Sequence, residues 1–254
     1  KPTTEEITVN PLLNLKDLID SFIDSQDVKL NSKNLYKRTL KQFFKWLDSS
    51  NYLLSDVKRP HVLEYKNHLL NSNKSSLTVG SYITSVRKFY EWAEANKFYP
   101  NVAKGIKSPK RIQQFKKQPL LPAQATELLE YYNITSNYRD YAIVNLLLRG
   151  GLRTIEVIRA CIEDITFKGS QRVLMVHGKG RDEKDNFIIL TDKAYKPILN
   201  YLKSRGKTNP SDPLFISKSN NSKGSRLTTR TISKIAKEGL KGIGLNNKSF
   251  TAHS

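Results

Sequence analysis

Four stretches within the first hundred residues carry apolar side chains at helical spacing, and this periodicity constrains the fold more than any other feature. The stretches are Asn14–Gln26, the residues after Ser32, those after Pro60, and those after Ser75. Ser32 and Ser75 are suited to capping their helices, and Pro60 suits a first helical turn. Four short helices with apolar faces must bury them against one another. The sequence therefore predicts a helical bundle over residues 1–103.

A basic stretch, Lys104–Lys117, follows this bundle and lacks any helical or alternating pattern. It contains Gly105 and Pro109 and no acidic residue. We expect an extended linker over residues 104–118. Such a linker either stays in solvent or lies along a phosphate backbone, and we favour the second interpretation.

The remaining residues, 119–254, combine helical patterns with two strand patterns. We expect strands at Arg172–His177 and Asn186–Leu190, joined by a polar hairpin, and a buried segment at Leu214–Ile216. The helices are expected at 122–132, 138–149, 154–161, 192–204 and 228–240. The predicted class is mainly α: a four-helix domain, then an α+β domain with a small antiparallel sheet.

The charge of the chain favours a polyanionic partner. Lys and Arg number 43 against 23 Asp and Glu, which gives a formal net charge of +20. The single Cys161 rules out a disulfide framework and is expected to be a small core residue. Because no apolar run is long enough to span a bilayer, we expect no membrane association. No phosphate-binding loop or metal-ligand pattern is present, so we expect no cofactor and no metal.

Three groups of side chains are candidates for DNA contact. Lysines repeat at i, i+4 in the second predicted helix. Like charges at this spacing destabilise a helix, and bound phosphates would offset that cost. Hydroxyl and cationic residues share an edge of the fourth helix, and further cations lie in the linker. These candidates are Lys33, Lys37, Lys41 and Lys45; Ser81, Thr84, Arg87 and Lys88; and Lys107, Lys110 and Arg111. A solvated basic surface is the simpler alternative for each group.

Three motifs in the second half resemble those of one family. They are LLLRGGLRTIEV around Arg153, a Gly-Lys-Gly between two strands at Lys179, and TAHS at residues 251–254. Their order and separation resemble the tyrosine recombinases, the phage-integrase and Xer-like family. The resemblance implies a DNA-binding helical domain followed by a catalytic domain.

The resemblance also implies roles for individual residues. Arg153 is the first catalytic arginine, whose guanidinium matches the charge of a pentavalent phosphate, and His253 is the second-box histidine. Lys179 is the hairpin lysine that protonates the departing hydroxyl, although Lys184 is a second candidate. Glu156 either braces Arg153 or is an ordinary acid of the first helical turn. Arg181 and Arg230 are further candidates for DNA contact.

The function implied by the resemblance is site-specific recombination through a phosphotyrosyl intermediate, as by an integrase of a mobile element. The partner is double-stranded DNA with inverted-repeat half-sites, bound by a homotetramer of the full-length protein in the cytoplasm of a bacterium. The second arginine, the third-box His or Trp and the nucleophilic tyrosine have no matching position, so we expect this chain alone to be inactive. A non-catalytic DNA-binding regulator is the main alternative, and a topoisomerase-like enzyme is a third.

Overall fold

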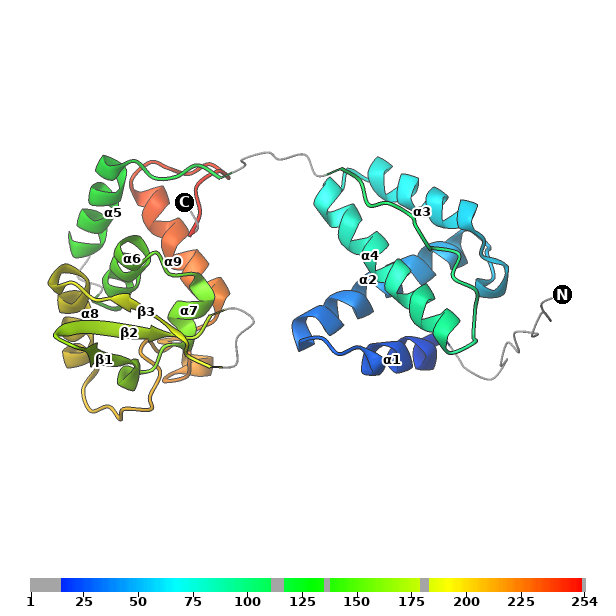
Figure 1. Cartoon of the computed structure of the whole chain (residues 1–254). Helices are drawn as coiled ribbons and strands as arrows, with labels where there is room; N and C mark the ends of the chain where they lie inside the picture. Colours follow the sequence, from blue (N-terminus) through cyan, green and yellow to red (C-terminus); the bar gives the residue numbers. More distant parts are fainter. Residues whose placement is uncertain (1–14, 111–116, 135–137, 179–182, 253–254) are drawn as a thin grey trace. The chain divides into compact units, whose positions relative to one another are not determined.

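In the computed structural model the chain forms two compact units, Lys1–Gln114 and Phe115–Ser254 (Figure 1). The structure describes residues 15–110, 117–134, 138–178 and 183–252. Each unit has its own hydrophobic core, and each is considered by itself.

The first unit is the predicted bundle of four helices. These are α1 (Leu15–Ser25), α2 (Leu30–Ser49), α3 (Arg59–Asn71) and α4 (Ser76–Ala95), with a short 3₁₀ turn, η1, at Leu54–Asp56. Helix α2 packs against α1 and α4, and the core is rich in aromatic rings such as Phe22, Phe43 and Phe89. Where α2 meets α4, Thr39 donates a buried hydrogen bond to Ser85 over 2.7 Å.

The predicted helix starts are confirmed at two of three positions. The Ser75 hydroxyl accepts the backbone N–H of Thr78 at 3.2 Å and so caps α4, and Pro60 lies in the first turn of α3. The expected cap at Ser32 is wrong, because α2 begins two residues earlier. The carbonyl of Lys29 accepts the N–H groups of Ser32 and Lys33, which places Ser32 within the first turn.

The stretch after α4 packs onto the first unit for longer than an extended linker would. Ala103 and Ile106 are buried in the core, and Lys66 Nζ donates to the Lys107 carbonyl at 2.8 Å. Arg59 and Arg87 donate to the carbonyls of Lys104 and Ile106. Residues 104–108 therefore pack on the bundle and do not form the predicted extended linker. The sequence could not predict this, because two buried apolar residues three positions apart are too few to show a periodicity.

The second unit consists of five helices and a three-stranded sheet in the part of the chain that the structure describes. One helix, α6 (Tyr138–Gly150), contacts the other four. The helices are α5 (Pro122–Ile134), α6 (Tyr138–Gly150), α7 (Thr154–Arg159), α8 (Asp192–Arg205) and α9 (Thr229–Gly242). Short 3₁₀ turns occur at η2 (Ile162–Asp164) and η3 (Asn220–Ser222). The strands are β1 (Ile165–Lys168), β2 (Gln171–Val176) and β3 (Asn186–Ile189), antiparallel in the order β1-β2-β3.

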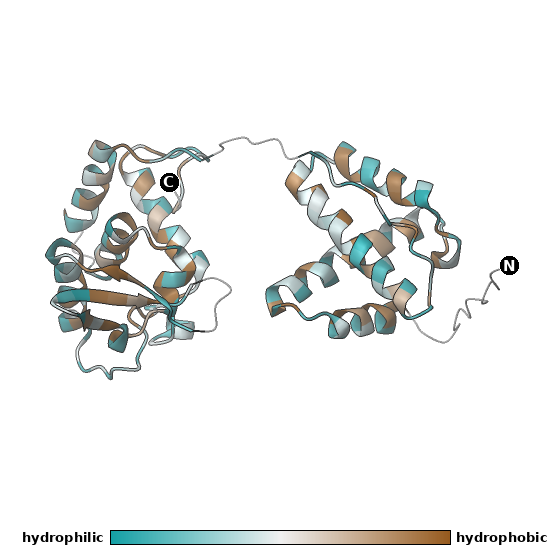
Figure 2. Ribbon diagram, viewed as in Figure 1, coloured by the Kyte–Doolittle hydropathy of each residue, from teal (hydrophilic) through white to brown (hydrophobic). Residues whose placement is uncertain are grey.

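Strand β1 was not predicted: its residues, ITFK, alternate apolar and polar, but the run is only four residues long and its burial does not alternate. The register sets Leu174 of β2 between Ile165 and Ile188, and this row of side chains joins the core. Strand β2 is accordingly apolar along most of its length in Figure 2. Leu214 and Phe215 are buried, as predicted.

Cys161 corrects another prediction. It is half-buried and lies outside the hydrophobic core, and its Sγ accepts a hydrogen bond from Arg226 Nη2 at 3.2 Å. The residue forms an isolated bridge with Pro213 at the edge of the fold, where a polar neighbour reaches it.

Candidate active site and nucleic-acid interface

A glycine-containing turn between α6 and α7 positions the principal candidate, Arg153. Gly151 has φ of +60°, a left-handed conformation that glycine adopts readily. A Cβ at Gly150 would lie 2.6 Å from Ile188 Cδ1, so the end of α6 packs directly on strand β3. Leu152 is buried and fixes the turn from the other side. The turn therefore delivers Arg153 to the start of α7 from a rigid base.

Arg153 and Glu156 form one unit at the N-terminus of α7. The backbone N–H of Arg153 donates to Glu156 Oε2 at 2.7 Å, and Arg153 Nη1 donates to Oε1 at 3.0 Å. The side chain of Arg153 is 67% exposed, whereas that of Glu156 is 7% exposed. One buried carboxylate thus caps the helix and orients the guanidinium, so the two roles considered for Glu156 coincide. The other N–H groups of Arg153 stay available for an anion.

Two cations hold the ends of the β2–β3 connection. Arg159 Nη1 donates to the Gly178 carbonyl at 2.9 Å, and Lys184 Nζ lies 2.5 Å from Asp164 Oδ1. Asp164 is buried and also accepts the backbone N–H of Cys161 at 2.7 Å. The sequence analysis missed Arg159 and Asp164. Arg159 binds a backbone carbonyl, which no side-chain motif marks, and the lysine that pairs with Asp164 lies far along the chain.

This arrangement bears on the choice between the two hairpin lysines. The hydrogen bond that Lys184 donates to Asp164 raises the pKa of Lys184 despite partial burial, so Lys184 keeps its proton and is occupied with anchoring the hairpin. Lys179 and Arg181 lie outside the described residues, and their roles remain predictions.

Helix α9 packs against α7 and brings a further cation to the same unit. Arg230 lies in the first turn of α9, which Thr228 caps by accepting the N–H of Thr231, and its side chain is exposed. Arg226, just before α9, donates to the carbonyls of Ile158 and Ala160 and so ties the two helices together.

Residues 249–250 pack within the second unit. Phe250 is buried in the core, and Ser249 exchanges hydrogen bonds with Gln118 at 3.0 and 3.1 Å. His253 lies outside the described residues.

The buried tyrosines are unsuited to nucleophilic attack. Burial raises the pKa of Tyr65, Tyr90 and Tyr132 well above the ordinary value. Their hydroxyls therefore resist deprotonation, and the surrounding core keeps a DNA strand away from them.

The lysine ridge of α2, Lys33, Lys37, Lys41 and Lys45, is less uniform than its spacing suggests. Lys37 Nζ lies 2.6 Å from Asp20 on α1, and this hydrogen bond lowers the pKa of Asp20. Lys33 Nζ is 3.5 Å from the Asp24 carbonyl. Part of the repulsion along the ridge is thus offset within the protein. Among these four lysines, only Lys41 and Lys45 are both exposed and without an ion pair in the part of the chain that the structure describes.

The polar edge of α4 is also partly engaged within the protein. Lys88 pairs with Glu91 at 2.8 Å, and Arg87 donates to the Ile106 carbonyl at 3.4 Å. Ser81 and Thr84 line a groove beside α2. Lys107 and Lys110, next to Ser108 and Pro109 of this groove, are both exposed, and Arg111 lies outside the described residues.

The described residues contain neither a cluster of metal ligands nor a helix suited to span a membrane. No three His, Cys, Asp or Glu side chains among them cluster as metal ligands would. No helix among them is both long and apolar enough to cross a bilayer.

The chain thus combines a four-helix unit with a mainly helical unit that contains a three-stranded sheet and an arginine at the N-terminus of α7. Residues 118–254 match the phage integrase family, and residues 21–97 match the phage integrase N-terminal SAM-like domain. The chain belongs to the phage integrase family of tyrosine recombinases.

Relatives of known sequence include bacterial recombinases. A tyrosine recombinase of Pseudothermotoga lettingae is 34% identical over 186 residues, which are 71% of this chain and 62% of that protein. Tyrosine recombinase XerD of Staphylococcus epidermidis is 28% identical over 237 residues, 88% of this chain and 75% of that protein. The chain thus spans about 62–75% of the length of these relatives.

Solved structures share the fold at low sequence identity. The XerH site-specific recombinase bound to palindromic difH substrate gives a TM-score of 0.71 at 17% identity, covering 94% of this chain and 70% of that one. A lambda integrase dimer bound to a COC' core site gives 0.72 at 14% identity, covering 95% and 67%. These likenesses confirm the predicted fold class.

Proposed function

We propose that this chain is the DNA-binding and catalytic part of a site-specific recombinase that acts as an integrase of a mobile element. The observation that carries the proposal is the exposed guanidinium of Arg153, fixed by a buried Glu156 at the end of a rigid glycine turn. An arginine held in this way has a pre-set fork of donors and loses little side-chain entropy on meeting a phosphate.

In the proposed reaction a tyrosine attacks a DNA phosphodiester and forms a phosphotyrosyl bond, and a deoxyribose hydroxyl leaves. Charge gathers on the non-bridging oxygens, where Arg153 donates hydrogen bonds and stabilises the transition state. Lys179 gives its proton to the deoxyribose oxygen whose bond to phosphorus breaks, so that it leaves as a hydroxyl, and His253 donates to the phosphate. No tyrosine of this chain is assigned as the nucleophile.

The first unit and the N-terminus of α9 would supply the DNA contacts. Lys41, Lys45 and Arg230 are exposed cations suited to phosphates. In the solved structures, XerH recombinase is bound to a palindromic substrate and lambda integrase is bound as a dimer to a core site. By analogy we propose inverted half-sites for this protein and a homotetramer as the active assembly.

Two measurements on the full-length protein test this proposal. Hydroxyl-radical footprinting on its target should show two inverted half-sites around a short unprotected centre. A duplex nicked near the cleavage position should then accumulate a covalent protein–DNA product on a denaturing gel. Protection without any covalent product would favour the non-catalytic regulator instead.

A further inference from the structure

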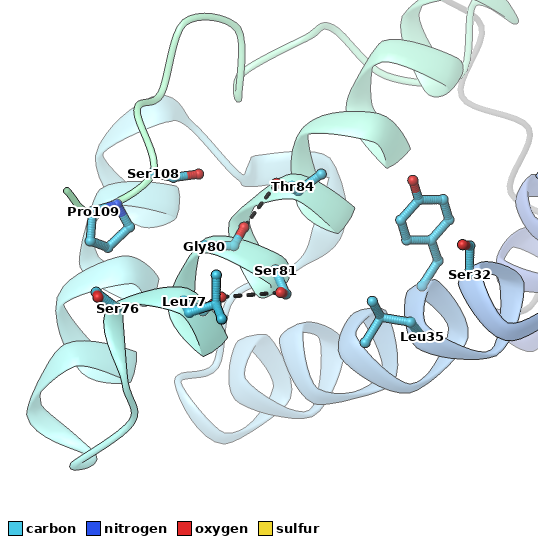
Figure 3. Close-up of a pocket in the computed structure, with 10 residues that line it drawn as sticks. Ser32, Leu35, Ser76, Leu77, Gly80, Ser81, Thr84, Ser108 and Pro109 are labelled. Carbon is cyan, nitrogen blue, oxygen red and sulfur yellow. Dashed lines mark hydrogen bonds between the residues drawn. The ribbon is translucent and has the colours of Figure 1, made fainter. Parts of the chain in front are cut away.

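A groove with an uncharged lining opens between the first half of α2, the first half of α4 and residues 108–109. It holds about 250 Å³ (Figure 3). Its walls carry serine and threonine hydroxyls together with Leu35 and Leu77. Charged residues lie beside the groove along the chain, at Lys33 and at Lys107 and Lys110.

This separation of charge matters for what the groove can bind. Cations, hydroxyls and backbone N–H groups all hold phosphates, whereas apolar side chains contact bases, above all the thymine methyl. An uncharged lining that includes two leucines is therefore suited to contact with base edges. The +20 charge of the chain makes a nucleic acid the partner that fits.

Two hydroxyls of the groove have committed their hydrogens. Ser81 Oγ donates to the Leu77 carbonyl at 3.1 Å, and Thr84 Oγ1 donates to the Gly80 carbonyl at 2.8 Å, as the dashed lines in Figure 3 mark. Each oxygen therefore presents lone pairs to the groove. In the major groove of DNA, lone pairs match the exocyclic amino groups of adenine and cytosine and oppose the O6 and N7 acceptors of guanine.

The apolar side chains distinguish adenine from cytosine. Leu77 is 59% exposed at the groove, and Leu35 on α2 lines the same space. An A·T pair presents an amino group and the thymine methyl on one major-groove edge, whereas a C·G pair has the amino group but no methyl. Hydroxyl acceptors beside leucines thus match an A·T pair on two counts.

Gly80 keeps the groove open. A Cβ at this position would lie 3.6 Å from Ser108 Cβ, which is an ordinary contact, so the fold tolerates alanine there. Alanine also favours a helix interior over glycine. The glycine therefore leaves room that the packing of the protein itself does not require.

From these observations we propose that the groove between α2 and α4 reads the major-groove edge of A·T pairs. Leu77 contacts the thymine methyl, and Ser81 and Thr84 accept from the adenine amino group. The inference rests on the proposed DNA binding and adds the class of base pair that the first unit selects.

The test uses the full chain and duplexes selected from a random pool by its own binding. Each thymine of a selected site is replaced by deoxyuridine, which removes only the methyl. Each adenine is replaced in turn by purine deoxynucleoside, which removes only the amino group. At one or two A·T pairs we expect each change to weaken binding about four-fold, the effect of one buried methyl group in the first case.

Variants then assign the effect to side chains. Leu77→Ala should abolish the sensitivity to deoxyuridine, and Ser81→Ala should reduce the sensitivity to the missing amino group. Leu53→Ala is the matched control, since Leu53 is 69% exposed in the same unit but lies outside the groove. Gly80→Ala should weaken binding to selected sites while its unfolding midpoint stays the same or rises.

Two failures are distinguishable. If selected duplexes bind tightly but tolerate deoxyuridine everywhere, or if Leu77→Ala keeps the sensitivity of the wild type, the inference is wrong and DNA binding stands. If the pool yields no sequence bound more tightly than random DNA, both the inference and site-specific binding are overturned.

Discussion

Removing the ammonium of Lys184 should release one end of the β2–β3 connection and destabilise the second unit. The variant is Lys184→Met, which keeps the length of the side chain. In the wild type Lys184 Nζ is 2.5 Å from Asp164 Oδ1, and Asp164 is only 4% exposed. After the substitution the buried carboxylate keeps its bond from the Cys161 N–H but has no cation.

The magnitude follows from the burial of the two partners. Loss of a charged hydrogen bond costs about 1.5–3 kcal/mol, and a fully buried ion pair that loses one partner costs about 3–5 kcal/mol. Because the side chain of Lys184 is 34% exposed, water weakens the pair and the lower range applies. We expect the free energy of unfolding to fall by about 1.5–3 kcal/mol in urea titrations at pH 7.

Asp164→Asn and the double variant complete a double-mutant cycle. The two single variants leave an unpaired group each, whereas the double variant leaves none. The summed loss of unfolding free energy in the two single variants should therefore exceed the loss in the double variant by about 1 kcal/mol or more. Amide hydrogen exchange should speed up near Gly178 and Asn186 in Lys184→Met. Additive effects, or exchange unchanged at both positions, would refute the view that this pair anchors the hairpin.

The pH dependence of the same pair has a definite sign. The pKa of Lys184 is raised in the folded protein, so its contribution is complete below the unfolded value of about 10.4. The contribution is lost as pH rises through the folded pKa. The difference in stability between wild type and Lys184→Met should therefore be constant from pH 7 to 9 and shrink above that range.

Substitutions at Gly150 and in the lysine ridge have clear expected outcomes. Gly150→Ala should lower the free energy of unfolding by about 1–3 kcal/mol in urea titrations, because a Cβ would meet Ile188 Cδ1 at 2.6 Å; an unchanged midpoint would show that β3 yields freely. Lys41→Gln with Lys45→Gln should reduce the slope of log K against log salt by about 1.8, whereas Lys37→Gln should change it less because Lys37 is paired with Asp20. Equal slopes for wild type and the double variant would mean that Lys41 and Lys45 face solvent.

Local periodicity was sufficient to predict most of the helices and the β2–β3 hairpin. The stripe of α4 and the cap at Ser75 are properties of adjacent residues, so they can be read along the chain. Strand β1 could not be predicted from neighbouring residues, because its four residues are held by pairing with β2 and bury little apolar surface. Ile106 likewise is buried by α3 and α4 side chains that the local sequence does not reveal.

The candidate site divides in the same way. Arg153 and Glu156 are three residues apart on one helix, and their pairing follows from helical spacing. The partners of Arg159 and Lys184 lie 19 and 20 residues away, where no periodicity applies. The lysine ridge shows the opposite error, since spacing predicted four equivalent cations and α1 contributes Asp20 to one of them.

The most direct measurement of the central claim is covalent trapping by the full-length protein on a nicked duplex that carries its target. Arg153→Ala should lower the rate of covalent product by about 100-fold or more while changing DNA affinity little, as for the loss of a transition-state donor. Arg149→Ala is the matched control, since Arg149 is an exposed arginine near the end of α6, four residues before Arg153, and it should trap DNA like the wild type. Wild-type trapping by Arg153→Ala would contradict the assignment of Arg153 to the scissile phosphate.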